Sequence, residues 1–205
     1  MKKRAWLVFA AFTALLAVAF VMHANPSASD EISRLAVLMQ WKPTAVVADI
    51  GAGDGRYAFA AAQHVPSGKV FATEIDTQKL AELRREVKKR NLRNVQIIES
   101  KEADTNLPEQ CCDAIFLRRV YHHLTRPVEF DTALVRSLKP GGRLAILDFP
   151  PRSGLEPVEG VPANRGGHGI PQHIVVEELT AAGLQLEKTL DDWPEDSYCV
   201  LFVKK

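Results

Sequence analysis

Acidic residues and glycines lie at the ends of two neighbouring apolar segments, in a pattern that suits cofactor binding. The loop 49–55, Asp-Ile-Gly-Ala-Gly-Asp-Gly, closes the apolar segment 45–50, and Glu74 lies near the end of the next, 69–75. Glycine allows positive φ and close approach of the backbone to a ligand. Glycines also form ordinary tight turns, but a carboxylate at Glu74 can accept hydrogen bonds from both hydroxyls of a ribose. Together they predict a nucleotide-type cofactor site.

The residues within the loop indicate which cofactor fits. Dinucleotide-binding loops carry a third small residue where this chain has Arg56, and they place a pyrophosphate at a helix N-terminus. Asp49 and Asp54 would repel a pyrophosphate. They favour a cofactor with a positive end, such as an ammonium or a sulfonium group.

A second group of reactive side chains follows the fourth apolar segment. Tyr121 and His122 are candidates for a general base, and Asp148, at the end of the fifth segment, is expected to face the same cleft. The alternative for His122 and for His123 is packing and capping at the start of a helix. That alternative is the preferred interpretation for His123.

Two further residues are candidates for contact with a substrate. Arg119 suits an anionic substrate, or it holds the loop; His168 lies in the Gly- and Pro-rich segment 150–169, which is typical of a lid. No second Cys or His pair has metal-ligand spacing, so no metal site is predicted. The cysteines are expected to be small, buried or half-buried residues.

The elements that position these residues alternate between strands and helices. Strands are expected at 45–50, 69–75, 95–98, 113–117 and 143–147, with helices from Asp30 and at 56–64, 77–90, 127–138 and 172–182. Asp30 is the expected cap of the first helix. This alternation predicts a Rossmann-like α/β fold with a mostly parallel sheet and helices on both faces. The helix-free pair 184–190 and 198–203 indicates one antiparallel strand at the end.

The N-terminal segment is unlike the rest of the chain. Lys2, Lys3 and Arg4 precede an apolar run that extends from Ala5 to Met22. This pattern is typical of a signal peptide or an uncleaved membrane anchor. We expect a leader at 1–24, a linker at 25–29 and one domain at 30–205, with export or membrane anchoring of that domain.

Composition excludes several other classes. The chain has 205 residues, 46% of them hydrophobic, which suits one ordinary domain rather than a disordered or collagen-like chain. Three cysteines are too few for a disulfide scaffold. The net charge of +1 gives no basic field for nucleic acid. Membrane contact is expected only through the N-terminal segment, and oligomeric state is not readable.

Three segments carry a family resemblance. VVADIGAGDGRYAFAAA, VFATEID and LKPGGRLAILDF resemble the motifs of class I S-adenosylmethionine (SAM)-dependent methyltransferases, in order and spacing from about residue 31 to 205. YHHL and PGGRL are similar to segments of the small UbiE-like methyltransferase domains. The resemblance implies a seven-stranded sheet whose last strand is antiparallel, with SAM as the cofactor.

The resemblance also implies roles for individual residues. Asp49 would contact the methionyl ammonium, Glu74 the ribose hydroxyls and Ile75 the adenine. The loop under the methionine part would consist of Gly51, Gly53 and Gly55. After the third strand many members carry an acidic residue that contacts the adenine amino group.

This chain departs from that pattern at the adenine end. Lys101 stands at the acidic position, and a charged lysine cannot accept a hydrogen bond. Glu102 or Asp104 could substitute after a small shift of the chain. The expected function is methyl transfer from SAM to a small-molecule acceptor. The alternatives are an NAD(P)-binding oxidoreductase and a non-catalytic domain that keeps the methyltransferase fold.

Overall fold

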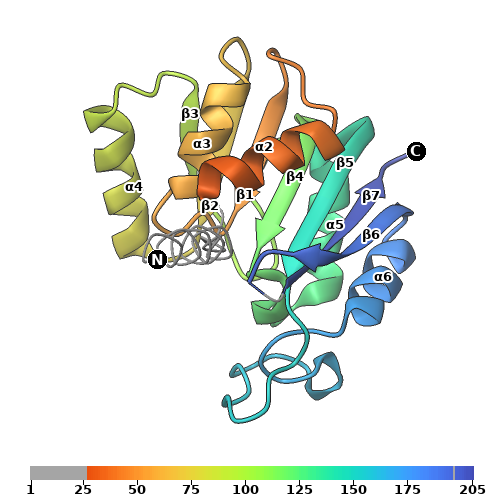
Figure 1. Ribbon diagram of the computed structural model, residues 1–205. Coiled ribbons are helices and arrows are strands. Elements are labelled where there is room, and N and C mark those ends of the chain that lie inside the picture. Colours follow the sequence, from red (N-terminus) through yellow and green to blue (C-terminus); the bar gives the residue numbers. More distant parts are fainter. Residues whose placement is uncertain (1–26, 196) are drawn as a thin grey trace, which may run out of the picture.

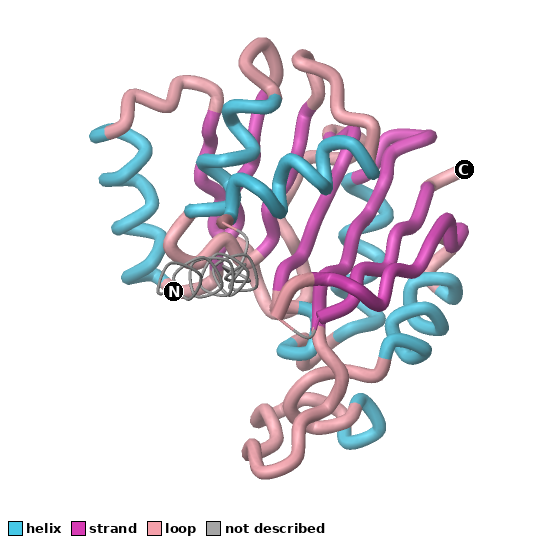
Figure 2. Tube along the Cα trace, in the orientation of Figure 1, coloured by secondary structure: helices cyan, strands magenta, loops and turns pink. Residues whose placement is uncertain are grey.

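The computed structural model of the chain describes residues 27–195 and 197–205 (Figures 1 and 2). Its helices are α2 (Ala28–Leu38), α3 (Arg56–His64), α4 (Thr77–Lys89), α5 (Pro127–Ser137) and α6 (Gln172–Ala181), with 3₁₀ turns η1 (Tyr121–His123) and η2 (Ala163–Arg165). Its strands are β1 (Val46–Ile50), β2 (Lys69–Glu74), β3 (Val95–Glu99), β4 (Cys112–Arg118), β5 (Leu138–Asp148), β6 (Gln185–Trp193) and β7 (Ser197–Val203).

The strands form one seven-stranded sheet in the order β3-β2-β1-β4-β5-β7-β6. Neighbours from β3 to β5 run parallel, whereas β7 pairs antiparallel with both β5 and β6. The predicted Rossmann-like fold with an antiparallel last strand is therefore confirmed. The order reverses between β1 and β4, the place where open α/β sheets bind ligands beyond the carboxyl ends of their strands.

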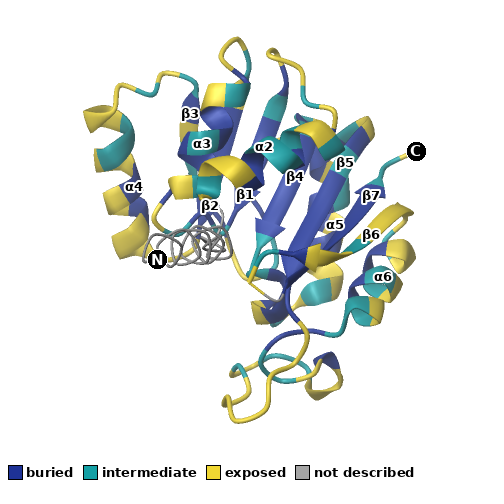
Figure 3. Ribbon diagram, viewed as in Figure 1, coloured by how far each residue is buried: buried dark blue, intermediate teal, exposed yellow. Residues whose placement is uncertain are grey.

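Helices cover both faces of the sheet, and each face has its own apolar core (Figure 3). Ile32 of α2, Phe59 of α3 and Leu83 of α4 belong to the core on one face. Leu134 of α5 and Val175 of α6 belong to the core on the other. Because β1 and β4 are covered on both sides, their residues are almost continuously apolar.

The first helix begins earlier than the sequence indicates. Ser27, not Asp30, is the N-cap of α2, and the two side chains form a reciprocal capping box. Asp30 accepts from the Ser27 backbone N–H at 3.0 Å, and its own N–H donates to Ser27 Oγ at 3.3 Å. Residues 28 and 29, expected in the linker, thus lie in the helix.

Two irregular segments lie at opposite ends of β5. Residues 138–142, which precede the expected strand 143–147, are part of β5, and the pairing of β5 with β4 shifts register between Cys112 and Ala114. At the other end, residues 149–171 form the long loop expected from the Gly- and Pro-rich sequence, which hangs beyond the carboxyl edge of the sheet (Figure 1). This loop therefore lies on the side of the sheet where the site is expected.

The expected leader at 1–24 lies outside the described residues. Within residues 27–195 and 197–205, no helix has both the length and the apolar character needed to cross a membrane.

Candidate active site

A cleft opens at the carboxyl ends of β1, β2 and β4, where the sequence places its acidic and glycine residues. It has two lobes, one of about 440 Å³ and one of about 610 Å³. Both lobes are lined by Gly51, Gly53, Arg118 and Arg119. Glu74 and Ile75 line only the smaller lobe, which we call the inner lobe, and the other, which we call the outer lobe, reaches the start of α2.

The glycine loop forms the shared wall of the two lobes. Gly51 has φ +70° and Gly53 has φ +58°, values that favour glycine. A Cβ on Gly51 would lie 2.6 Å from Val120 Cγ2, whereas a Cβ on Gly53 would meet nothing closer than 4.0 Å. The loop therefore combines a tight contact at Gly51 with open space above Gly53.

This contrast predicts different costs for two alanine substitutions. Gly53→Ala should lower the free energy of unfolding by about 1 kcal/mol, the cost of a left-handed backbone for alanine. Gly51→Ala adds the overlap with Val120, so the loss should reach about 2 to 4 kcal/mol. Urea unfolding of the two variants measures the difference, and equal losses would contradict the contact with Val120.

Asp49 lies at the end of β1 with its carboxyl group buried against the outer lobe. The residue is 3% exposed, and its Oδ2 has no hydrogen-bond partner within the described part of the chain. Burial, with the negative charges of Glu74 and Asp54, raises its pKa to about 8. A cationic group in this lobe would satisfy the oxygen and favour the charged form of Asp49.

The raised pKa predicts a pH-dependent stability cost. Because folded Asp49 holds its proton to about pH 8 while an unfolded aspartate loses it near pH 4, stability falls as pH rises between these values. Asp49→Asn removes this dependence. Without cofactor, its gain in unfolding free energy over the parent should be larger at about pH 8.5 than at about pH 5. Urea unfolding at both pH values measures this gain, and a gain independent of pH would contradict the buried acid.

Glu74 ends β2 with its carboxylate held by backbone groups. Gly53 N–H donates to its Oε2 at 2.9 Å, and the N–H groups of Ile75 and Asp76 donate to its Oε1 at 2.8 and 3.1 Å. Oε2, which accepts one hydrogen bond, retains a lone pair for a further donor. Ile75, beside it, is 52% exposed although apolar, so it presents a flat apolar surface to the inner lobe.

The far end of the inner lobe is lined by Ser100, Lys101 and Glu102. Asp104 does not line it: its carboxylate accepts from Arg136 Nη2 and from the Asn106 N–H, both at 2.8 Å. The predicted cofactor contact of Asp104 is therefore not supported by the structure, because its side chain is committed to the opposite side of a tight turn. Glu102 is the acidic residue that the cleft contains.

Tyr121 is wrong as a candidate base. Its side chain is fully buried, and its hydroxyl lies 2.9 Å from both Asp131 Oδ2 and Glu178 Oε2. Burial and these carboxylates raise its pKa. Arg165, from the long loop, donates to both Glu178 oxygens and to the Tyr121 carbonyl. The phenol thus belongs to a buried polar network in the core.

His122 and Asp148, which the sequence places at the cleft, form a hydrogen-bonded pair behind the cleft wall. His122 is 2% exposed; its Nδ1 lies 2.8 Å from Asp148 Oδ1, and its N–H donates to Oδ2 at 3.1 Å. The neighbouring ring, His123, lines the inner lobe and stacks on His122 with centroids 4.0 Å apart. Burial and the neighbouring His122 lower the pKa of His123 to about 4. Of the two histidines, it is therefore His123 that reaches the cleft.

The two residues expected at the substrate both lie near Phe149. His168 packs from the long loop, with ring centroids 6.1 Å from Phe149 and 5.6 Å from His122. The Arg119 guanidinium lies 5.5 Å from the centre of the Phe149 ring. Arg119 lines both lobes, whereas His168 lines neither.

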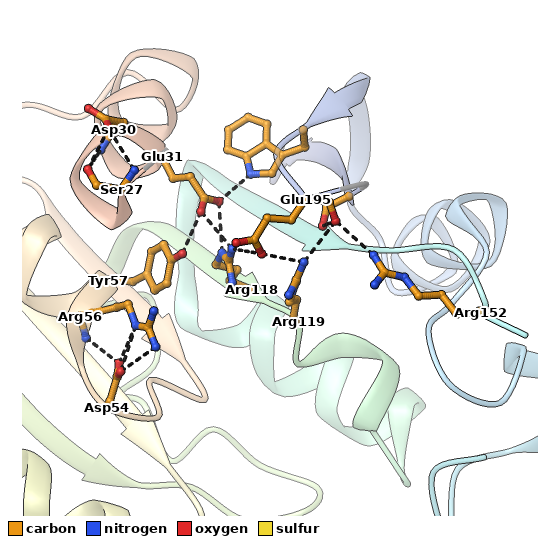
Figure 4. Close-up of polar contacts among 12 residues, drawn as sticks. Ser27, Asp30, Glu31, Asp54, Arg56, Tyr57, Arg118, Arg119, Arg152 and Glu195 are labelled. Carbon is orange, nitrogen blue, oxygen red and sulfur yellow. Dashed lines mark hydrogen bonds and ion pairs between the residues drawn. The ribbon is translucent and has the colours of Figure 1, made fainter. Parts of the chain in front are cut away.

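A buried carboxylate that the sequence analysis missed connects α2 to this site. Glu31 is 3% exposed, and its oxygens accept from Arg118, the Tyr57 hydroxyl and the Trp193 indole at 2.8 to 3.1 Å (Figure 4). It lies four residues before the buried Leu35, so it continues the apolar stripe of the helix. The presence of a charged residue on an otherwise apolar helix face is the feature of the sequence that could have identified Glu31.

Residues 27–195 and 197–205 contain no group of three or more His, Cys, Asp or Glu side chains arranged to hold a metal ion. All three cysteines are free, and Cys112 and Cys199 are buried. The chemistry of the site therefore depends on the carboxylates, arginines and histidines described above.

Comparisons with known proteins agree with this geometry. Residues 48–146 match the family described as "Methyltransferase domain". A SAM-dependent methyltransferase from Aquifex aeolicus is 25% identical, with a TM-score of 0.66 over 86% of this chain and 98% of its own. A putative sarcosine dimethylglycine methyltransferase from Galdieria sulphuraria is 13% identical, with a TM-score of 0.68 over 86% of this chain and 85% of its own.

The same fold also occurs with another activity. The [4+2]-cyclase SpnF is 16% identical, with a TM-score of 0.70 over 86% of this chain and 81% of its own. Likeness of fold alone therefore does not assign a reaction. The match of residues 48–146 to a methyltransferase domain, with the likeness to the SAM-dependent methyltransferase from Aquifex aeolicus, supports a SAM-dependent methyltransferase.

Proposed function

We propose that this enzyme transfers the methyl group of SAM to a small-molecule acceptor bound in the inner lobe. The observation that carries the proposal is the buried Asp49 carboxyl group, which has an oxygen without a partner among the described residues, beside a glycine loop. Such a group is costly unless a ligand satisfies it. The YHHL and PGGRL segments support placement in the UbiE-like subgroup.

The residues of the cleft fit SAM from end to end. Asp49 would hold the methionyl ammonium, beside the loop glycines Gly51, Gly53 and Gly55. Glu74 would accept from the ribose hydroxyls, Ile75 would pack on the adenine, and Glu102 would take the place of the missing acidic residue at the adenine amino group. When bound, SAM supplies a methyl group already activated on a sulfonium sulfur.

The chain's own residues then place the acceptor and remove its proton. His123 is the imidazole on the wall of the inner lobe. Its low pKa keeps the ring unprotonated at neutral pH and makes it a weaker base than an exposed histidine. His122 and Asp148 are positioning residues, because their hydrogen bonds fix the ring on which His123 stacks. Alignment of the acceptor supplies much of the remaining rate enhancement.

Calorimetry tests the proposal and separates it from the oxidoreductase and non-catalytic alternatives. SAM and S-adenosylhomocysteine should bind, and NADH should not. Glu74→Ala should weaken binding of S-adenosylhomocysteine. The control is Glu187→Ala, which removes an ion pair between Glu187 of β6 and Arg143 of β5 and should leave this binding unchanged. Absence of SAM binding at about millimolar concentration would contradict the proposal, since such affinity corresponds to only about 4 kcal/mol. Unchanged binding in Glu74→Ala would contradict the ribose contact.

We further propose that residues 1–24 act as a signal or membrane anchor that takes the domain to the outer side of the membrane. The basic residues before the apolar run support this orientation. Protease added to intact cells should then degrade the domain. Protection of the domain in intact cells, with degradation after lysis, would contradict export.

A further inference from the structure

Three arginines converge on one glutamate at the mouth of the cleft (Figure 4). Glu195 lies in the turn between β6 and β7, and its Oε2 is 2.8 Å from Arg119 Nη2 and 3.2 Å from Arg118 Nη2. Its backbone carbonyl accepts from Arg119 at 3.2 Å and from Arg152 of the long loop at 3.1 Å. A single residue thus binds three arginines that border the site, two of them through its carboxylate and the third through its backbone carbonyl.

Glu195 is one of only two carboxylates that this cluster sets against its three guanidinium groups, among the described residues. Arg118 has a second partner, since Glu31 accepts two hydrogen bonds from it at 3.0 and 3.1 Å. Within the described residues, Arg119 pairs with no carboxylate other than Glu195, and Arg152 reaches only the Glu195 backbone carbonyl. If the Glu195 side chain swung away, three guanidinium groups would face the one carboxylate of Glu31. The resulting local field would attract another anion.

The cluster lies beside the proposed site of methyl transfer. Arg118 and Arg119 line both lobes of the cleft, and Glu195 lines the outer lobe. Arg119 and Arg152 both lie over the Phe149 ring, at 5.5 and 4.6 Å, and the same ring contacts His122 at 4.8 Å. An anion held by Arg119 would therefore lie at the wall of the inner lobe, which Arg119 and His123 both line.

We propose that the methyl acceptor carries a carboxylate, which Arg119 and Arg118 bind in place of the Glu195 side chain. The proposal rests on the proposed function, because it names the class of acceptor for that reaction. The acceptor's carboxylate would take the place of the Glu195 carboxylate, which has the same charge and the same planar shape. Arginine binds this shape through two parallel N–H groups. Arg152 adds positive charge from the loop.

Exchange of the two carboxylates is feasible because Glu195 is accessible. Its side chain is 33% exposed, unlike Glu31, whose side chain is 2% exposed. Glu31 has three side-chain donors, so it is the fixed partner, and Glu195 is the exchangeable one. A bound internal competitor lowers apparent affinity by the fraction of molecules in which it occupies the site.

A matched pair of ligands tests the proposal without knowledge of the natural acceptor. The full-length protein, with and without saturating S-adenosylhomocysteine, is titrated with benzoate and with its neutral isostere benzamide. Benzoate should bind at least about tenfold more tightly, because charge-assisted hydrogen bonds form only with the acid. Phenyl phosphate as a third ligand distinguishes a carboxylate site from a phosphate site. Tighter binding of phenyl phosphate would contradict the assignment to a carboxylate.

Two variants, each with a control, assign the effect to the cluster. Glu195→Gln should tighten benzoate binding about threefold to tenfold, because the competitor is removed. Arg119→Gln should reduce benzoate binding to the level of benzamide. Glu187→Gln and Arg143→Gln alter an ion pair of similar exposure between β6 and β5 and should change the binding of neither benzoate nor benzamide.

The possible outcomes separate this inference from the proposed function. Equal binding of benzoate and benzamide would overturn the carboxylate inference. Weaker benzoate binding in Glu195→Gln would also overturn it, because that is the result expected if Glu195 only stabilises the β6–β7 turn. The heat of S-adenosylhomocysteine binding is recorded in the same experiment. Loss of that heat alone would refute the SAM site and not the carboxylate site.

Discussion

Replacing His123 with alanine is expected to lower kcat for methyl transfer by about 10²-fold, the lower end of the usual contribution of a positioned general base, because a pKa of about 4 makes this imidazole a weak base. The expectation applies to an acceptor whose hydroxyl or amine must lose a proton. His123 is the imidazole on the wall of the inner lobe, and no other histidine lines either lobe among the described residues. Transfer of labelled methyl from SAM measures the loss.

The pH profile gives a second, independent signature of His123. Because burial lowers its pKa to about 4, the imidazole is already unprotonated across the neutral range. With saturating SAM and acceptor, kcat should show no histidine titration near about pH 6.5, the ordinary value. His173→Ala, an exposed histidine on α6, is the control and should keep full activity. Full activity in His123→Ala would refute the role of His123.

Replacing Arg165 with methionine is expected to lower the free energy of unfolding by about 3 to 5 kcal/mol, as for other buried ion pairs that lose one partner. Arg165 is 1% exposed, and its guanidinium donates to both oxygens of Glu178 and to the carbonyls of Leu124 and Tyr121. Methionine fills much of the volume but leaves these acceptors, and the nearby Asp131, without the cation. Urea unfolding measures the loss.

The matched control is an arginine that also pairs with a glutamate but lies at the surface. The Arg126 and Glu129 side chains are 55% and 48% exposed, so Arg126→Met should change stability by less than about 1 kcal/mol. Arg165 also ties residues 149–171 to the core. Limited proteolysis should therefore cut this loop faster in Arg165→Met than in the parent. Equal stability of the two variants would contradict the buried network.

The sequence was sufficient to predict the fold because its signals are local. Alternation of strands and helices indicated the parallel sheet, and the helix-free final pair indicated the antiparallel strand β7, as observed. The cleft was predictable for a similar reason. Asp49 and Glu74 end neighbouring strands, and the carboxyl ends of parallel strands meet at one edge of the sheet. Local pattern and topology therefore bring these two residues together.

The directions of the side chains in the turn after β4 could not be predicted in this way. Tyr121 and His123 lie in the single turn η1, yet one enters the core and the other lines the cleft. The partners that draw Tyr121 inward, Asp131 and Glu178, lie 10 and 57 residues further along the chain. No spacing rule links them. Asp104 was misjudged for the same reason, since Arg136 lies 32 residues away.

The charged network at the mouth of the cleft also depends on distant partners. Glu31 and Trp193 are separated by 162 residues, and Arg118 and Glu195 by 77. Only the approach of α2 and the β6–β7 turn to the end of β4 brings them together. Glu31 left a trace in the sequence, as a charge on an apolar stripe, whereas Glu195 left none.

The central claim, that SAM binds in this cleft with Glu74 at its ribose and Asp49 at its methionyl ammonium, is tested most directly by a crystal structure with S-adenosylhomocysteine. We predict both ribose hydroxyls within hydrogen-bond distance of Glu74, at roughly 2.6–3.2 Å. The ligand's ammonium should face Asp49, directly or through a water molecule. An adenosine located outside the lobes lined by Gly51, Gly53 and Glu74, or no bound ligand at saturating concentration, would contradict the claim.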